Sequence, residues 1–142
     1  MGYGFPAAIS ASLEHPDRQV VCLAGDGCFQ MTCNEMSTAI QHGANPITIV
    51  MNNGRYGTIR MHQEKHYPAR VSGTALANPD FAAFARAYGG HGELVERSED
   101  FPAAFARAQA SGLPAVIECR VDDEALSTGA TLSAVRAAAQ GD

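Results

Sequence analysis

No stretch of this 142-residue sequence is apolar for long enough to cross a membrane, which takes about 20 consecutive apolar residues. The first residues also lack the basic and apolar regions of a signal peptide, so we expect a cytoplasmic protein. Basic patches are missing as well, because the ten Lys and Arg residues are scattered through a chain of formal net charge −5. We therefore expect no nucleic-acid partner.

Paired cysteines are absent too. Cys22, Cys28, Cys33 and Cys119 form no C-x-x-C motif, which indicates neither a disulfide framework nor a zinc site. Cys22 and Cys119 lie in apolar runs and are expected to be packing residues. The chain has 46% apolar and 18% charged residues and no linker or repeat. This composition predicts one folded domain over residues 1–142.

Short β-branched apolar runs alternate with helical patterns along the chain. Strands are predicted at Gln19–Ala24, Ile47–Met51 and Ala115–Val121, with a weaker candidate at Glu93–Glu96. Helices are predicted at Pro6–Leu13, from Thr32 to Gly43, from Asn78, from Ser98 to Gly112, and at Leu132–Ala139. Continuous apolar strands are typical of a sheet covered on both faces. The predicted class is α/β, doubly wound, with a mostly parallel sheet and helices on both faces.

Several helix ends carry capping patterns. Thr32 and Glu35 form a capping-box pattern, and Gly43 suits the left-handed end of that helix. Asn78 is the predicted N-cap of the helix that follows Pro79. The polar segment between Gly54 and Gly73 is predicted to be a loop with a short helix.

Two polar turns follow successive predicted strands. Gly25-Asp26-Gly27 follows the first strand and Asn52-Asn53-Gly54 the second, so both turns are expected at the carboxyl edge of the sheet, where ligands bind. The glycines allow a positive φ and leave the Gly27 and Cys28 amides available to an anion. Asp26 and Asn53 offer the oxygen ligands that Mg²⁺ prefers. Each string alone also occurs in ordinary turns.

The spacing of Gly25-Asp26-Gly27 and Asn52-Asn53 resembles the signature of thiamine-diphosphate-dependent enzymes. The run from Met1 to Ala8 (MGYGFPAA) resembles the stretch that precedes this signature in the acetolactate synthase-like branch. The resemblance is strongest up to about Gly57. It implies the diphosphate-binding domain of such an enzyme, begun partway through and therefore expected to be incomplete at the N-terminus, as a fragment or a separately encoded subunit.

The resemblance also implies site residues. Mg²⁺ would be bound by the Asp26 carboxylate, the Asn53 side-chain oxygen, the Arg55 backbone carbonyl, two diphosphate oxygens and a water. Among the cofactor-binding residues, the Gly27 and Cys28 amides would hold the diphosphate, and Met1 would lie near the bend of thiamine diphosphate. The remaining expected cofactor-binding residues are Gly25, Asn53 and Tyr56, although the side chains of Arg55 and Tyr56 have an equal alternative as surface groups.

The activity implied by the resemblance is decarboxylation or carboligation of a 2-oxo acid, by a lyase or transferase. Related enzymes take the activating glutamate from a separate pyrimidine-binding domain, and none of Glu14, Glu35 and Glu64 lies in that motif. The chain alone is therefore expected to be inactive. Its expected partners are a pyrimidine-binding domain or subunit, a 2-oxo acid and further copies of itself, because an exposed half-site would leave apolar surface in water.

Other readings stay open at this point. The chain is alternatively a non-catalytic cofactor-binding or interaction module, or a subunit of a 2-oxo acid oxidoreductase. A nicotinamide-binding domain ranks low because no G-x-G-x-x-G follows the first strand. His62 and His66 have the spacing of a helical metal pair without a third ligand, and we expect solvated or packing histidines, with a proton-donor role near substrate as the minority alternative. His42 is expected to cap a helix.

Overall fold

The computed structural model describes residues 1–127 and 129–141. The chain divides into two units. The first unit contains Met1–Asn52 and Asn78–Arg120, and the second contains Asn53–Ala77 and the segment that begins at Val121. The expectation of a single domain over residues 1–142 stays a prediction.

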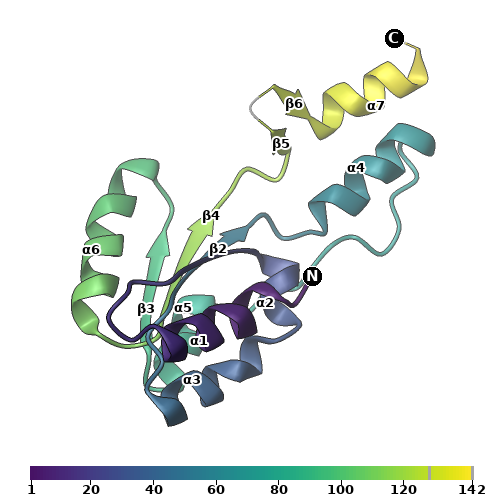
Figure 1. Cartoon of the computed structure of the whole chain (residues 1–142). Helices are drawn as coiled ribbons and strands as arrows, with labels where there is room; N and C mark the ends of the chain where they lie inside the picture. The colour runs from purple at the N-terminus through teal and green to yellow at the C-terminus, as the bar shows by residue number, and fades with distance from the viewer. Residues whose placement is uncertain (128, 142) are drawn as a thin grey trace. The chain divides into compact units, whose positions relative to one another are not determined.

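A four-stranded parallel sheet with strand order β1-β2-β4-β3 is the centre of the first unit (Figure 1). The strands are β1 (Val21–Gly25), β2 (Ile47–Asn52), β3 (His91–Val95) and β4 (Ala115–Arg120). All four lie where the apolar runs predicted strands, including the weak candidate. The sheet is parallel because each connection between neighbouring strands contains a helix that crosses back along the sheet.

Helices cover both faces of this sheet. They are α1 (Gly4–Glu14), α2 (Asp26–Gln30), α3 (Met36–His42), α5 (Phe81–Ala87) and α6 (Phe101–Ser111), with short 3₁₀ turns η1 (Cys33–Glu35) and η2 (Ser98–Asp100). In Figure 1, α6 lies on the opposite side of the sheet from α1, α3 and α5. The predicted α/β class, with a mostly parallel sheet and helices on both faces, is confirmed.

Side-chain alternation along the strands produces a separate core under each helical layer. One core surrounds Phe29, whose ring makes edge contacts with Phe5 and Phe81 at centroid distances of 5.1 and 5.6 Å. The other packs Ile117 of β4 against Ala104 and Ala108 of α6. The small alanines let this helix approach the sheet closely, so the sheet is buried on both sides at its centre.

The helix ends agree with the sequence in some places and correct it in others. Gly43 ends α3 in the left-handed conformation, at φ 70°, as predicted. The capping box at Thr32 is wrong, because its hydroxyl donates to the carbonyl of Gly2 instead of capping a helix. The N-cap of α5 is Asp80, whose carboxylate accepts from the amide of Ala83 at 2.7 Å. The prediction that Asn78 is this cap is therefore wrong.

The second unit is a pair of helices with a small hairpin. Its elements are α4 (Gly57–His66), β5 (Ala125–Ser127), β6 (Ala130–Thr131) and α7 (Leu132–Gln140). Helix α4 packs along α7, and β5 pairs with β6 in antiparallel orientation. The predicted loop with a short helix between Gly54 and Gly73 is thus largely the ten-residue helix α4, and the hairpin was not predicted.

Candidate functional site

An open hollow of about 180 Å³ lies at the carboxyl end of β1, in the first unit. Met1, Gly25 and Cys28, three of the residues predicted to bind a cofactor, line it together with Tyr3 and Leu23. Met1 reaches this place because α1 packs on β1, so the start of the chain lies beside the end of the first strand. The structure thus brings together two segments that the sequence linked only through the family pattern.

Asp26 is the first residue of α2 and is only 3% exposed. Gly25 before it has extended backbone, at φ −72° and ψ 156°, and Gly27 lies within α2. The positive φ that these two glycines allow is therefore not adopted. The amide of Gly27 donates to Oδ1 of Asp26 at 2.8 Å, so the expectation that this amide is available to an anion is wrong. Its predicted role in cofactor binding stays a prediction.

A second bond holds the other oxygen of the Asp26 carboxylate. Nδ2 of Asn78 donates to Oδ2 of Asp26 at 2.7 Å and also to Oδ1 of Asn52 at 2.7 Å. Oδ1 of Asn78 in turn accepts from Nε2 of Gln30. One side-chain amide thus joins the beginning of α2 to the last residue of β2.

The network continues to a fully buried carboxylate on β4. Nδ2 of Asn52 donates to Oε1 of Glu118 at 2.7 Å, and the amide of Phe81 donates to Oε2 at 2.9 Å. Glu118 is 0% exposed, with the guanidinium of Arg120 3.1 Å from its Oε1. These bonds offset the cost of burying a charged group. They also bind the beginning of α5 to the sheet.

The three remaining predicted site residues belong to the second unit, at the turn after β2. Gly54 adopts the left-handed conformation, at φ 69°, and Oδ1 of Asn53 accepts from the amide of Arg55 at 3.2 Å. The backbone of Arg55 forms an isolated antiparallel β-bridge with Ala75, and the amide of Tyr56 donates to the carbonyl of Thr74 at 2.9 Å. The turn that carries Asn53, Arg55 and Tyr56 is therefore held by backbone pairing, and the predicted ligand roles of these residues stay predictions.

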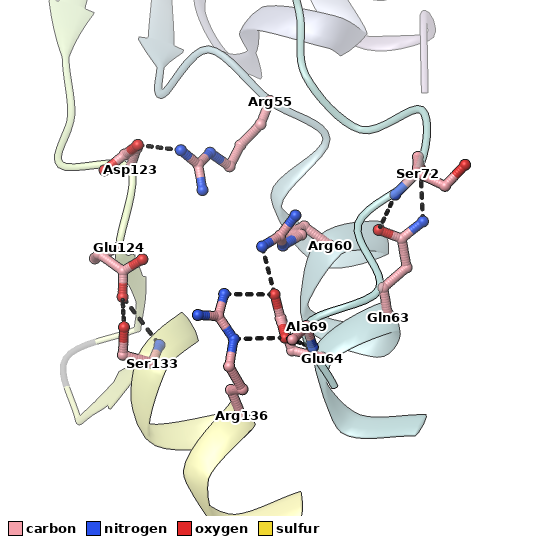
Figure 2. A network of polar contacts seen from close by, with 10 residues as sticks. All are labelled: Arg55, Arg60, Gln63, Glu64, Ala69, Ser72, Asp123, Glu124, Ser133 and Arg136. Atoms are coloured by element: carbon pink, nitrogen blue, oxygen red, sulfur yellow. Dashed lines mark hydrogen bonds and ion pairs between the residues drawn. The ribbon is translucent and has the colours of Figure 1, made fainter. Parts of the chain in front are cut away.

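Figure 2 shows the polar contacts that hold the second unit together. Nε and Nη2 of Arg136 donate to the two carboxylate oxygens of Glu64, at 2.8 and 2.7 Å. The guanidinium of Arg60 forms a further ion pair with this carboxylate. The amide of Ala69 adds a bond of 2.9 Å. These contacts lower the pKa of the buried Glu64 carboxyl to about 2, mainly through the hydrogen bonds from Arg136. The same picture shows Arg55 paired with Asp123.

The histidines and cysteines singled out in the sequence all lie in described helices or strands, and their expected roles stay predictions. His62 and His66 stack with ring centroids 6.2 Å apart on α4, and no group of three metal-ligating His, Cys, Asp or Glu side chains occurs among the described residues. His42 is the last residue of α3. The four cysteines are not disulfide-bonded, and burial raises the pKa of the Cys22 and Cys119 thiols. Among residues 1–127 and 129–141, no helix is long and apolar enough to cross a membrane.

Three residues of the network were missed by sequence reasoning. Glu118 is a charged residue that directly follows the apolar residues Val116 and Ile117 in β4, which is a usable signal, because a charge in a fully covered strand needs a partner. Asn78 was missed because its sequence context matched a helix cap. Gln30 has no local pattern that distinguishes it from a surface residue.

Known proteins resemble this chain in sequence and in fold. Residues 1–119 match the family model described as the thiamine pyrophosphate enzyme, C-terminal TPP binding domain. The chain is 37% identical over 123 residues to the acetolactate synthase large subunit of Parasynechococcus marenigrum, covering 85% of this chain and 20% of that protein. It is 36% identical over 125 residues to the acetolactate synthase isozyme 2 large subunit of Escherichia coli, covering 87% and 23%.

A solved structure gives the same result. The thiamine diphosphate-dependent 4-hydroxybenzoylformate decarboxylase of Rhodococcus jostii RHA1 superposes with a TM-score of 0.80 at 36% identity, covering 86% of this chain and 23% of that one. The chain thus spans only about a fifth of the length of these relatives. The match to the family model extends over most of the chain and includes Asp26, Asn53 and the hollow. The chain therefore belongs to the family of C-terminal TPP-binding domains of thiamine pyrophosphate enzymes.

Proposed function

We propose that this chain binds Mg²⁺ and the diphosphate of thiamine diphosphate, as part of an enzyme that decarboxylates or carboligates 2-oxo acids. The observation that carries the proposal is the buried Asp26 carboxylate, held on both oxygens, with Gly25 and Cys28 of the same turn lining the hollow beside Met1. A buried carboxylate with fixed orientation fits a hard divalent cation, which takes oxygen ligands.

Six of the predicted residues have a defined part in the proposal, and Gly25 and Tyr56 would lie beside the cofactor. Asp26, the Asn53 side-chain oxygen and the Arg55 carbonyl would bind the cation. Gly27 would lie beside the diphosphate, and the amide of Cys28 would donate to it. Met1 lines the hollow and would lie near the bend of the cofactor. Bound thiamine diphosphate would supply the electron sink for cleaving or forming a bond beside the 2-oxo group. The residues of this chain would anchor and orient it.

The acetolactate synthase and 4-hydroxybenzoylformate decarboxylase names of the relatives support the substrate class. We infer that a pyrimidine-binding domain or subunit completes the site and supplies the activating acid, and that the complete protein is a cytoplasmic oligomer. The exposed apolar side chains of Tyr3 and Leu23, 81% and 68% exposed at the edge of the hollow, support such a partner. A monomer by sedimentation at micromolar concentration would contradict self-association.

Calorimetric titration with thiamine diphosphate tests the anchoring site. We expect binding that requires Mg²⁺ and weakens at least about 100-fold in Asp26→Ala, because loss of a ligand exceeds the 10- to 100-fold effect of losing a group that only supports one. The control is Asp17→Ala, at an exposed aspartate, which should bind like the wild type. Binding that is independent of Mg²⁺, or a folded wild-type chain that does not bind, contradicts the proposal.

Adding a pyrimidine-binding partner then separates the enzyme from the alternatives. Consumption of a 2-oxo acid only when both parts are present supports a divided enzyme, and product analysis distinguishes decarboxylation from carboligation. Mg²⁺-dependent binding without turnover in the reconstituted complex would favour a non-catalytic cofactor-binding module.

A further inference from the structure

Asn78 occupies the centre of the polar network in the first unit. Its amide nitrogen contacts both Asp26 and Asn52, at 2.7 Å each, and its oxygen accepts from Gln30. It lies 52 residues from Asp26 and 26 residues from Asn52 in the chain. Asp80 caps the N-terminus of α5, so the side chain of Asn78 has no capping role there.

The orientation of each amide in this network follows from the carboxylates at its two ends. An ionised carboxylate only accepts hydrogen bonds, so the group that faces it must be a donor. Glu118 therefore requires the nitrogen of Asn52, which turns the Asn52 oxygen toward Asn78. Asp26 requires the nitrogen of Asn78, whose two protons then serve Asp26 and Asn52. The donor and acceptor pattern is consistent over the whole chain of bonds.

This arrangement fixes the plane of the Asp26 carboxylate. The Gly27 amide bonds one oxygen and Asn78 the other, at 2.8 and 2.7 Å. A carboxylate held on both oxygens cannot swing to present the two of them together to a cation. Mg²⁺ demands near-octahedral geometry, which binding by both oxygens of one carboxylate would distort, whereas the larger Ca²⁺ binds a carboxylate through one or both oxygens in a flexible shell. The fixed plane of Asp26 therefore withholds a binding mode that Ca²⁺ can use and Mg²⁺ does not need.

We propose that Asn78 is a positioning residue for the cation site: by holding Asp26 in single-oxygen geometry it makes the site selective for Mg²⁺ over Ca²⁺. The inference rests on the proposed function and deepens it, because it assigns the cation preference of the same site to a residue outside the expected ligand set. The bond between Asn78 and Asn52 is itself held in place by Glu118. This buried carboxylate, 0% exposed, accepts from Asn52 and so fixes the orientation of the Asn52 amide.

The test is the ratio of thiamine diphosphate affinities measured by calorimetry with Mg²⁺ and with Ca²⁺. In the wild-type chain Mg²⁺ should support the tighter binding. In Asn78→Ala the ratio should fall about tenfold, at the lower end of the effect of removing a group that orients a metal ligand. Asn78→Ser is too short to bridge Asp26 and Asn52 and should give the same fall. It is the variant to use where Asn78→Ala does not fold. Asn34→Ala, at an exposed asparagine, is the matched control.

The outcomes separate this inference from the proposed function. A lower Mg²⁺ to Ca²⁺ ratio in the Asn78 variants, with an unchanged ratio in Asn34→Ala, supports the positioning role, because a general loss of folded protein weakens both measurements equally. Wild-type binding with an unchanged ratio in folded Asn78→Ala or Asn78→Ser overturns the inference alone. A folded wild-type chain that binds thiamine diphosphate with neither cation overturns both.

Discussion

Replacing Glu64 by glutamine removes the charge that holds α4 to α7 while keeping the shape of the side chain. Glu64 is 1% exposed and accepts from Arg136, Arg60 and Ala69. In Glu64→Gln, the guanidinium of Arg60, itself 8% exposed and with a buried Nε that has no hydrogen-bond partner, loses its anion. A buried cation without a counter-charge is costly, so we expect the second unit to be destabilised.

The size of the effect follows from the pKa of Glu64. The pKa falls from 4.5 to about 2, which corresponds to about 3 kcal/mol at about 1.4 kcal/mol per unit. The Arg136 side chain is 34% exposed, so water screens part of its contribution and about 2 kcal/mol is the better figure. Because the folded-state pKa is the lower one, the charge stabilises the fold above pH 4.5, and this stabilisation is lost as the pH falls toward 2.

Urea unfolding of wild type and Glu64→Gln, together with amide hydrogen exchange in α4 and α7, measures this difference. The unfolding free energies of the two proteins should differ by about 2 kcal/mol near neutral pH. Below pH 4.5 this difference should shrink, by up to about 1.4 kcal/mol per pH unit. Glu14→Gln, at an exposed glutamate, should unfold like the wild type. A difference that stays constant between neutral and acidic pH would refute the ion-pair explanation and indicate a packing defect instead.

Two further predictions concern the first unit. Asp80→Ala removes the cap bond to Ala83 and should lower the free energy of unfolding by about 1 kcal/mol; an unchanged urea midpoint would show that the cap contributes nothing. Gly92→Ala places a methyl group 2.0 Å from the carbonyl oxygen of Ala82, and backbone atoms cannot yield, so little folded protein is expected by circular dichroism. The control is Gly43→Ala, whose new methyl group meets no atom within 4 Å although the residue has φ 70°. This variant should fold and lose only about 1 to 2 kcal/mol of unfolding free energy. Equal losses in the two glycine variants would contradict the steric argument.

The order of elements could be predicted from the sequence because it depends on local patterns. Continuous β-branched runs distinguish buried strands, and glycine in the left-handed conformation ends a helix whatever lies around it. Both considerations gave the strands and the end of α3 at Gly43 correctly. The order of Asp26 and Asn53 after successive strands is equally a property of the sequence. The identification of the family could therefore start from residues alone.

The environment of Asp26 required the tertiary structure, because its partners are distant in the sequence. Asn78 and Asp80 both suited the N-cap position by residue type. In the structure Asp80 caps α5, and the side chain of Asn78 binds Asp26, which is 52 residues away in the sequence. Glu118 meets Asn52 only because β4 lies beside β2 in the sheet. In the second unit, Glu64 and Arg136 are 72 residues apart and meet only because α4 packs on α7. Local propensity determines which segments become strands and helices, whereas strand order and helix packing determine which polar side chains meet.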